Sequence, residues 1–432
     1  MENMRVFVKS YGCSTNQADG ETLAGCLAKA GHELASTVTS ADVAVYNTCA
    51  VKGPTENRII ELLKRFPRSK KLIVAGCLPS IDFERLSAEV QFDGVVGPAA
   101  GMRIVDVVDR VLKGEKVIEV GPTHSELPEL SLPRCSSGSV VSIVPISYGC
   151  LGSCAYCCVV FARGHLRSHS VEEIVQRVKG DLGAGFREFW LTSQDVACYG
   201  RDKQTNLANL LKALCVIDGD FRIRVGMMTP DMTMGILEDL LSAFEDDRIF
   251  KFVHLPVQSG DDGVLRLMRR HYSVSDFRSV VDAFRTGFHE VTLATDVICG
   301  FPGENEADFD RTLRVIEEVN PDITNVSKFF ARPKTPAAAM TNRFIPLSEV
   351  KRRSVSASAL AKRIAFEKNQ KWKDWSGTIL VDEVGKVPGS WVGRNYAYKP
   401  ITIKEGDNLF GKSLRVHVEE VFPTYLAGRL IR

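Results

Sequence analysis

The sequence of 432 residues has no long apolar run and no marked excess of charge of either sign. No stretch approaches the roughly 18 apolar residues of a membrane-spanning helix, and residues 1–10 lack the apolar centre of a secretory signal. The sequence therefore predicts a cytoplasmic protein with no membrane partner. Its net charge is only +2, so any surface that binds nucleic acid has to come from a local basic patch.

Twelve cysteines are the unusual feature of an otherwise ordinary composition. In the cytosol, cysteines serve more often as metal ligands, catalytic groups or buried core residues than in disulfides. The 44% hydrophobic and 25% charged residues are typical of a soluble globular protein, and the length allows about two to four domains. The spacing of the cysteines is therefore the first guide to function.

Three cysteines stand within eight residues in the segment Cys150–Cys157 (CLGSCAYC). Clustered thiolates suit soft metals and iron–sulfur clusters. A tetrahedral zinc site needs four ligands, usually as CxxC pairs, and no His or Cys partner stands at finger spacing here. Three cysteines on one tight loop can instead hold three irons of a [4Fe–4S] cube and leave the fourth iron open. The loop predicts such a cluster, with zinc or incidental buried cysteines as the alternatives.

Residues 1–115 alternate between strand and helix patterns, which predicts a parallel sheet with helical crossovers. Three strands are expected, at residues 4–10, 41–46 and 71–75. Each is followed closely by a cysteine, and these cysteines are Cys13, Cys49 and Cys77. Because ligands gather outside the carboxyl ends of parallel strands, we expect the three thiols to lie together. They predict a second cluster site, and three unrelated buried cysteines are the alternative.

Residues 138–345 carry six strand patterns separated by helical ones, after a linker rich in Pro, Ser and Gly over 116–137. The strands are expected at 140–147, 188–192, 221–225, 250–255, 291–298 and 325–330. A β/α series of this length predicts a barrel or partial barrel whose chemistry gathers at the carboxyl ends of the strands. Three polar segments follow strands there, namely Ser193-Gln194-Asp195, His254–Gly260 and Asp296–Glu304.

The last part of the chain predicts a basic helix and a small antiparallel β domain. The helix is expected over 346–374 and the strands at 376–384, 396–403, 413–422 and 425–431. Residues 371–432 carry 10 Lys and Arg against 7 Asp and Glu, a net of +3. Small basic barrels with exposed aromatic residues bind RNA by stacking and phosphate contact, although a basic run is often only a solvated helix face. The candidate RNA contacts are Lys371, Lys373, Arg394, Tyr396 and Lys399.

The CxxxCxxC loop at the start of a six-unit β/α series resembles the radical S-adenosylmethionine (SAM) superfamily. The resemblance implies that Cys150, Cys154 and Cys157 bind a [4Fe–4S] cluster whose open iron chelates SAM. One-electron reduction of the sulfonium then yields a 5′-deoxyadenosyl radical, while the protein supplies orientation and excludes water. Tyr156 takes the aromatic position that lies near the adenine in that family. Cys158 follows directly, but a CxxxCxxxC spacing does not match the superfamily.

Further segments resemble motifs of a narrower group within this superfamily. They are ARGxxRS after the cysteine loop, HLPVQSG at 254–260 and TDxxxGFPGE at 295–304, where Cys299 replaces a common aliphatic residue. The residues that the resemblance places around SAM are Arg163, Arg167, Ser193, Gln194, Asp195, His254, Gln258, Asp296 and Gly300. Taken singly, Asp296 could cap a helix, His254 could be a core residue with its hydrogen bonds satisfied, and each arginine could form a surface ion pair.

The C-terminal part resembles a TRAM domain, and the domain order resembles the methylthiotransferase family over almost the whole chain. The expected α/β fold has an N-terminal parallel α/β sandwich domain over 1–115, a central partial (β/α)6 barrel over 138–369 and a TRAM-like all-β barrel over 370–432. The resemblance implies a second [4Fe–4S] cluster on Cys13, Cys49 and Cys77 whose open iron carries sulfur. SAM would be used both as methyl donor and as radical source, with a one-electron reductant as partner.

Segments 10–19, 47–52 and 149–154 look most like the archaeal and eukaryotic branch of that family. That branch adds a methylthio group at adenine C2 of N6-threonylcarbamoyladenosine 37 in the anticodon loop of tRNA. Isopentenyladenosine 37 of tRNA and an aspartate of a ribosomal protein are alternative substrates for the same chemistry. An RNA-binding iron–sulfur sensor without turnover is the alternative from another class of function.

Overall fold

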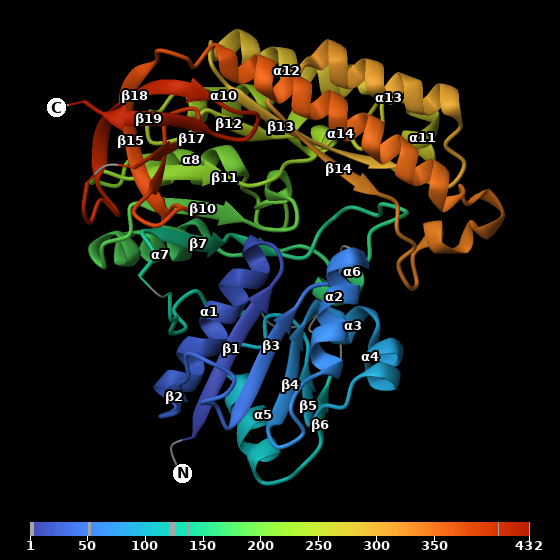
Figure 1. Ribbon diagram of the computed structural model, residues 1–432, viewed down its shortest axis with the longest axis vertical. Helices are drawn as coiled ribbons and strands as arrows, with labels where there is room; N and C mark the ends of the chain where they lie inside the picture. Colours follow the sequence, from blue (N-terminus) through green and yellow to red (C-terminus); the bar gives the residue numbers. More distant parts are fainter. Residues whose placement is uncertain (1–3, 51–52, 121–126, 137, 405, 432) are drawn as a thin grey trace.

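Figure 1 shows the computed structural model, which describes residues 4–50, 53–120, 127–136, 138–404 and 406–431. A three-layer α/β domain lies at the bottom of this view, and the central β/α domain lies above it. A small barrel at the upper left carries the C-terminus. Among the described residues, no helix is both long and apolar enough to cross a membrane.

The N-terminal sheet has six parallel strands in the order β2-β1-β3-β4-β5-β6. They are β1 (Arg5–Tyr11), β2 (Glu33–Leu34), β3 (Val43–Thr48), β4 (Lys71–Gly76), β5 (Gly94–Val96) and β6 (Val117–Glu119). The three strands predicted here are confirmed within two residues. The other strands are two or three residues long, too short for a hydrophobic pattern to reveal. Because β6 ends at residue 119, the sheet extends past the expected domain end at 115.

Helices cover both faces of this sheet. They are α1 (Ser14–Lys29), α2 (Gly53–Lys64), α3 (Cys77–Ile81), α4 (Phe83–Glu89) and α5 (Arg103–Leu112). Apolar residues of α1 and α5 pack in one core with one face of the sheet, and those of α2, α3 and α4 pack in another with the opposite face. With both faces covered, β3 is buried along its whole length, as is usual in a parallel sheet.

The central domain has six parallel strands in two sheets of three, ordered β7-β10-β11 and β12-β13-β14. They are β7 (Val141–Pro145), β10 (Glu188–Thr192), β11 (Arg222–Val225), β12 (Phe252–His254), β13 (Thr292–Cys299) and β14 (Ile323–Lys328). Isolated bridges, among them Met227 with His254, join β11 to β12. All six predicted strands are present, and together they form a partial barrel.

The expected first strand of this domain is interrupted. After β7, residues Ser147–Tyr148 form β8, which pairs antiparallel with β9 (Arg167–Ser168). This pairing folds the segment that follows the cysteine loop back against the end of β7. The loop 149–158 and the short helix α6 (Val159–Arg163) therefore form a compact unit at the carboxyl end of the strand.

Helices pack outside the partial barrel, most of them around one large apolar core and one, over residues 262–267, in a smaller core. They are α7 (Val171–Gly183), α8 (Leu207–Cys215), α9 (Pro230–Met234), α10 (Leu237–Phe244), α11 (Asp262–Leu267), α12 (Val274–Gly287) and α13 (Glu306–Val319), with 3-10 turns η1 (Val196–Cys198), η2 (Pro336–Ala339) and η3 (Thr341–Arg343). Capping boxes start α7, α12 and α13 at Ser170, Ser273 and Asn305, where the side chains satisfy backbone N–H groups that lack helical partners.

Helix α14 (Leu347–Gln370) leads into a closed barrel of five strands in the order β15-β16-β17-β19-β18. They are β15 (Ser376–Val384), β16 (Trp391–Arg394), β17 (Pro400–Ile403), β18 (Ser413–Val421) and β19 (Leu426–Leu430). The strand predicted over 396–403 is confirmed only for Pro400–Ile403, and β16 was not predicted. Residues 395–399 form a turn between β16 and β17, with Tyr398 in the left-handed region at φ +61°.

This turn docks the small barrel onto the central domain. The Tyr398 ring packs against Phe250 and Phe252, with ring centroids 4.8 and 5.1 Å apart. These phenylalanines lie at the beginning of β12, at the amino-terminal end of the partial barrel. The small barrel therefore closes the end opposite the cysteine loop.

Candidate active site

Cys13, Cys49 and Cys77 follow β1, β3 and β4, which are neighbouring strands of the N-terminal sheet. The strand order reverses between β1 and β3, so Cys13 and Cys49 flank the crevice where open α/β sheets bind their ligands. Cys13 is exposed, whereas Cys49 and Cys77 are buried. Burial raises the pKa of the Cys77 thiol to about 12, and the other two cysteines add to this rise. The fold thus brings the three cysteines together, as their placement after strands suggested. We call them the N-terminal trio.

Buried polar side chains tie the three loops of the N-terminal trio to one another. Asn47 Nδ2 donates to the Asn16 carbonyl at 2.6 Å, and Asn16 Nδ2 donates to Asn47 Oδ1 at 2.9 Å. Thr48 Oγ1 donates to the Ala75 carbonyl at 2.7 Å. Gly76 has φ +93°, and an added Cβ would lie 2.4 Å from the Thr48 carbonyl oxygen. Each loop therefore has a fixed backbone beside its cysteine. Val51 and Lys52, the last two residues of the segment 47–52 that contains Cys49, lie outside the described residues.

Cys150, Cys154 and Cys157 are partly exposed on the loop between β8 and α6, and we call them the central trio. Gly152 lies between two of the sulfurs. Its N–H donates to Cys150 Sγ at 3.2 Å, and an added Cβ would lie 3.3 Å from that sulfur and 3.6 Å from Cys154 Sγ. A side chain at this position would fill the space inside the loop, so the glycine keeps the concave face of the thiols open.

Arg270 belongs to this site although the sequence did not point to it. Its Nη1 donates to Cys154 Sγ at 2.9 Å, and its Nε donates to the Tyr272 hydroxyl at 3.0 Å. Tyr272 in turn donates to the Pro256 carbonyl at 3.0 Å. In sequence, Arg270 is one of two adjacent arginines far from the cysteines. Only its place soon after the 254–260 segment could have suggested a role.

The segment after β10 supports the central trio. Gln194 Oε1 accepts a hydrogen bond from the Gly149 N–H at 2.7 Å and so holds the start of the cysteine loop. Asp195 is buried, and its carboxylate accepts from the Thr229 hydroxyl at 2.5 Å. Ser193 Oγ accepts from the Asp195 N–H at 3.1 Å. The structure places these three predicted residues beside the loop, with Gln194 and Asp195 engaged in internal hydrogen bonds.

The predicted residues after β12 and β13 lie together at the carboxyl ends of the strands. His254 Nε2 lies 3.0 Å from Asp296 Oδ1, and Asn325 Nδ2 donates to the same oxygen at 2.8 Å. Gln258 bridges to Val297 of β13 and has φ +67°, a conformation that is uncommon for any residue but glycine. The backbone strain at Gln258 fits a position held for function.

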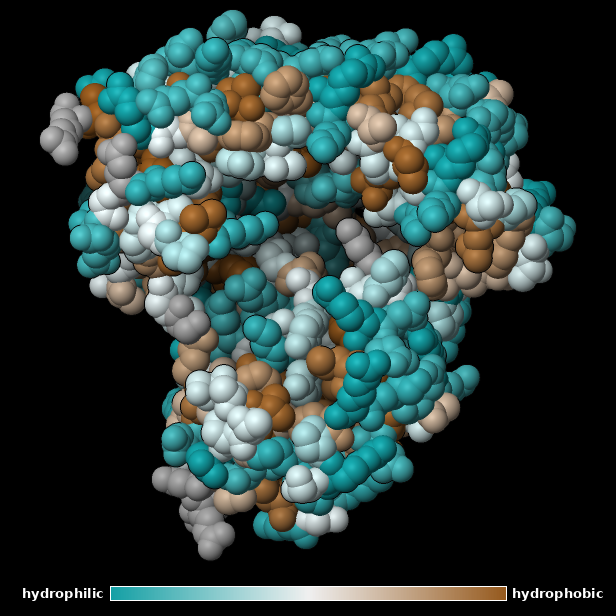
Figure 2. Space-filling model, in the orientation of Figure 1, coloured by the Kyte–Doolittle hydropathy of each residue, from teal (hydrophilic) through white to brown (hydrophobic). Residues whose placement is uncertain are grey.

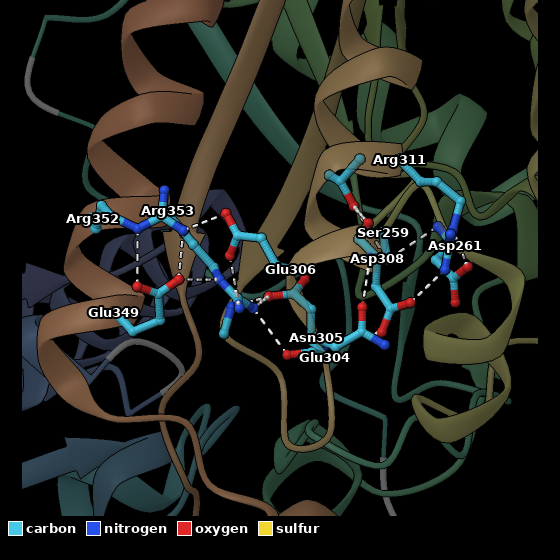
Figure 3. Close-up of polar contacts among 12 residues, drawn as sticks. Ser259, Asp261, Glu304, Asn305, Glu306, Asp308, Arg311, Glu349, Arg352 and Arg353 are labelled. Atoms are coloured by element: carbon cyan, nitrogen blue, oxygen red, sulfur yellow. Dashed lines mark hydrogen bonds and ion pairs between the residues drawn. The ribbon is translucent and has the colours of Figure 1, made fainter.

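Ion pairs hold the Gly300 and Asp261 loops to helices α14 and α13 (Figure 3). The Gly300 N–H donates to Glu304 Oε2 at 2.8 Å, and Arg353 of α14 donates to the same oxygen at 2.9 Å. Burial raises the pKa of Glu304, and the hydrogen bonds from Gly300 and Arg353 reduce this rise. On the other side, Arg311 of α13 donates to Asp261 at 2.6 Å. These pairs fix two loops that border the predicted SAM site.

Tyr156 and Arg167 also lie near the cysteine loop. The Tyr156 ring meets Phe301 edge-on, with centroids 6.4 Å apart, and burial raises its pKa well above the usual value. Arg167 Nη2 donates to the Arg163 carbonyl at 3.1 Å, and burial lowers the pKa of Arg167. Both residues therefore stabilise the segment around the central trio.

Arg163 lies at a different place from the one that its motif suggested. Its guanidinium pairs with Asp19 of α1 at 2.6 Å, and Tyr148 donates to the other oxygen of Asp19 at 3.1 Å. Burial opposes the charge of Arg163, but Asp19, Cys77 and Cys13 raise its pKa well above the usual value. Ala162, its neighbour on α6, packs in one apolar core with Cys77, so Arg163 lies near the N-terminal trio.

The carboxyl ends of the N-terminal strands point toward the central domain, and a recess with hydrophilic residues on its rim opens between the two in Figure 2. Ser14, next to Cys13, lies 2.8 Å from Thr192 at the end of β10, hydroxyl to hydroxyl. Buried Glu56 of α2 pairs with buried Arg332, which follows β14. These contacts hold the two cysteine trios on facing sides of one interface.

The remaining cysteines have other surroundings. Cys158 packs in the core of the N-terminal domain, where its thiol lies 3.8 Å from the Ala50 carbonyl. Cys198 is the exception, because its thiol donates to Asp195 at 3.2 Å and also hydrogen-bonds Cys150 of the central trio, which lowers the pKa of the Cys150 thiol. Cys26 and Cys299 are buried in cores, Cys215 packs against the core of the central domain, and Cys135 is exposed.

The five residues predicted to contact RNA differ in their exposure. The structure corrects the prediction that Lys399 contacts RNA. The Lys399 side chain is buried, and its ammonium pairs with Asp322 at 2.8 Å and donates to Asn369 at 3.0 Å. Arg394 is mostly buried against Asp382 and Glu383. Tyr396, Lys371 and Lys373 are exposed. A turn residue that docks two domains cannot present its charge to RNA, so the prediction for Lys399 fails.

The donor sets of the two trios suit iron–sulfur clusters. Each consists of three thiols, which are soft ligands. Among the described residues, no three His, Cys, Asp or Glu side chains are close enough to hold a single metal ion.

Sequence comparison relates both halves of the site to known families. The radical SAM superfamily matches residues 144–316, and the family described as "Uncharacterized protein family UPF0004" matches residues 5–97. A protein of Pyrococcus abyssi named "Probable threonylcarbamoyladenosine tRNA methylthiotransferase" is 39% identical over 430 residues, covering 99% of this chain and 100% of the relative. The human "Threonylcarbamoyladenosine tRNA methylthiotransferase" is 32% identical over 435 residues, covering 98% and 74%.

Among solved structures, a radical SAM methyltransferase, TsrM of Kitasatospora setae, with cobalamin and a [4Fe–4S] cluster bound, matches with a TM-score of 0.59. The match has 12% identity and covers 90% of this chain and 80% of that one, so it supports the fold alone. Membership in the radical SAM superfamily implies SAM and a [4Fe–4S] cluster as cofactors. The chain belongs to the radical SAM methylthiotransferase family, in the branch whose members are named threonylcarbamoyladenosine tRNA methylthiotransferases.

Proposed function

We propose that this protein replaces the hydrogen at adenine C2 of N6-threonylcarbamoyladenosine 37 in tRNA by a methylthio group. The observation that carries the proposal is the pairing of two cysteine trios across one interface. The names of the relatives at 32–39% identity supply the substrate. A reaction that needs both a radical source and a sulfur donor requires two such sites directed at one carbon atom.

Each trio has its own part in this proposal. Cys150, Cys154 and Cys157 would hold the cluster that binds SAM, and the N-terminal trio would hold a second [4Fe–4S] cluster. When bound, these groups and a one-electron reductant supply the chemistry that converts C2–H to C2–S–CH3. The chain itself joins the two domains that carry the trios through the contacts of Ser14 with Thr192 and of Glu56 with Arg332.

The residues at the strand ends would orient SAM. His254 and Asn325 fix the carboxylate of Asp296 within β13. Gly300 has φ +80°, its N–H donates to Glu304, and Val350 of α14 packs where a Cβ would lie, so the turn after β13 is held in one conformation. Arg270 beside Cys154 adds a partly buried positive charge that suits the SAM carboxylate. Pre-organised groups of this kind lose little entropy when the ligand binds.

The tRNA would be held by the exposed basic residues of the C-terminal part. Lys371 and Lys373 lie at the end of α14, and Tyr396 is 40% exposed on the barrel. Splayed bases of an anticodon loop can stack on such aromatic side chains, while lysines contact phosphates.

The test is nucleoside mass spectrometry after anaerobic reaction of the reconstituted protein with SAM, dithionite and tRNA. One tRNA carries threonylcarbamoyladenosine 37 and the other carries isopentenyladenosine 37. We expect the 2-methylthio product from the first tRNA only. Product from the second alone would refute the substrate assignment. Absence of both product and 5′-deoxyadenosine would leave an RNA-binding sensor as the better account.

A further inference from the structure

Arg163 carries a buried hydrogen-bond donor that has no partner among the described residues. Its side chain is 2% exposed, and so is that of Asp19, with which its Nη2 forms an ion pair at 2.6 Å. The other terminal nitrogen, Nη1, is buried and unpaired within the described part of the chain. A buried guanidinium donor without an acceptor destabilises the folded protein. Such a group is retained where an absent acceptor completes it.

The position of Arg163 indicates which acceptor this is. It ends α6, directly after the loop of the central trio, but it reaches across the interface to α1, which begins after Cys13. Ala162, next to it on α6, packs in one apolar core with Cys77, and besides Asp19 the groups that raise the pKa of Arg163 are Cys77, Cys13 and Tyr148. The guanidinium of Arg163, from the central domain, therefore lies near the cysteines of the N-terminal domain.

The negative charges around the N-terminal trio are stabilised by a positive group such as the Arg163 guanidinium. Three thiolates are required to bind a cluster, and two of the three cysteines are buried. Asp19 adds another negative charge close by, and Tyr148 holds it in place. Hydrogen bonds to sulfur and the net local charge set the reduction potential of an iron–sulfur cluster.

We propose that Arg163 is a positioning residue of the second cluster, with Nη1 donating a hydrogen bond to anionic sulfur at the N-terminal trio. The inference rests on the proposed function, which places a cluster there. Arg163 stabilises the negative charge of the cluster and of a thiolate on its open iron. Asp19 acts in the opposite sense, because it partly neutralises the guanidinium. The ion pair thus sets the charge at the sulfur-binding site as well as joining the domains.

A purely structural ion pair would behave differently from this pair. Loss of either partner would then weaken the interface in the same direction, because each change leaves one buried charge alone. If Arg163 acts on the cluster, removing Arg163 and removing Asp19 shift the reduction potential in opposite directions. The sign of the shift separates the two accounts.

The experiment uses the full chain with Cys150, Cys154 and Cys157 replaced by Ala, so that only the second cluster assembles. Its midpoint potential is titrated anaerobically by electron paramagnetic resonance, and methanethiolate binding is followed by the same signal. The variants are R163Q, R163K, D19N and the double variant D19N/R163Q. R177Q is the matched control, because Arg177 forms a comparable buried pair with Asp181 on α7.

We expect R163Q to lower the midpoint potential and to weaken methanethiolate binding about tenfold, about 1.4 kcal/mol. D19N should raise the potential, the double variant should lie between the two, and R163K should recover part of the binding. R177Q should leave both quantities unchanged. Equal potentials in R163Q and the parent, or shifts of the same sign in R163Q and D19N, would overturn the inference.

Iron analysis of the parent separates this inference from the proposed function. About four irons per chain in the parent confirm that the second cluster assembles, and no iron would refute the proposed function itself. If R163Q takes up no iron, D19N carries the test, because it retains the guanidinium. A potential in D19N that equals or falls below the parent value would then overturn the role of Arg163.

Discussion

Replacing Lys399 by Met should destabilise the docking of the C-terminal barrel without weakening RNA binding. Lys399 lies on the turn between β16 and β17, and its ammonium contacts Asp322 and Asn369 of the central domain and α14. Composition alone assigns this lysine to the RNA surface. The structure assigns it to the interface, so the two accounts predict different losses for the same substitution.

The magnitude follows from burial. The side chains of Lys399 and Asp322 are 5% and 1% exposed, and the Asp322 carboxylate also accepts from the Leu293 N–H at 3.1 Å. Removing one partner of a buried pair leaves a buried charge uncompensated and costs about 3–5 kcal/mol. The double variant K399M/D322N should recover most of this loss, because the amide that replaces the carboxylate would carry no charge and could still accept from the Leu293 N–H.

The pH dependence has a defined sign. Burial raises the pKa of Asp322, but Lys399 and Lys368 outweigh it, so the net shift is downward. A carboxyl whose folded-state pKa is lowered adds stability that is present above its ordinary pKa and is lost as pH falls through the folded value. The difference in stability between the wild type and K399M should therefore shrink below about pH 4.

The assay is urea unfolding followed by tryptophan fluorescence. Three of the four tryptophans, Trp372, Trp375 and Trp391, lie in the small barrel or at its start. The crossed control is K371M/K373M, which should unfold within about 0.5 kcal/mol of the wild type and should bind the anticodon stem-loop more weakly, with a smaller salt dependence. The reasoning is refuted if K399M unfolds like the wild type, or if it loses RNA affinity while keeping its stability.

Three further predictions concern the cysteine trios. Anaerobic reconstitution should give about eight irons per chain, and replacing the cysteines of either trio by Ala should leave about four; four irons in the wild type would remove the second site. G76A should lose iron from the N-terminal trio alone, because its Cβ would meet the Thr48 carbonyl at 2.4 Å and φ is +93°; full iron content in G76A would contradict this. Iron uptake by that trio should rise with pH between about 7 and 9, because the buried Cys77 thiol, with a pKa of about 12, has to release its proton on binding; uptake that is independent of pH would show that the thiol is not protonated in the free protein.

Much of the architecture could be predicted because it depends on rules that act locally. Parallel strands leave hydrophobic runs with turns at their carboxyl ends, and the same edge then collects whatever follows each strand. That rule alone placed Cys13, Cys49 and Cys77 together, although dozens of residues separate them. The strands that escaped prediction, such as β2 and β5, are short and take their conformation from neighbouring strands.

The roles of charged residues depended instead on tertiary contacts. Arg163 stands in a motif beside the cysteine loop, but α6 directs it to Asp19 of the other domain. Arg270 reaches Cys154 only because the chain folds back after α11. Lys399 resembles a surface lysine until the position of Asp322 is known. A charge in a sequence specifies no partner, so such assignments require the fold.

The central claim is that the two cysteine trios have separate tasks, and one measurement tests it most directly. Wild type, C49A and C154A are each incubated anaerobically with SAM, dithionite and tRNA, and 5′-deoxyadenosine and the 2-methylthio nucleoside are quantified in the same sample. We predict both products from the wild type, 5′-deoxyadenosine alone from C49A, and neither product from C154A. Methylthio nucleoside from C49A, or 5′-deoxyadenosine from C154A, would contradict the account.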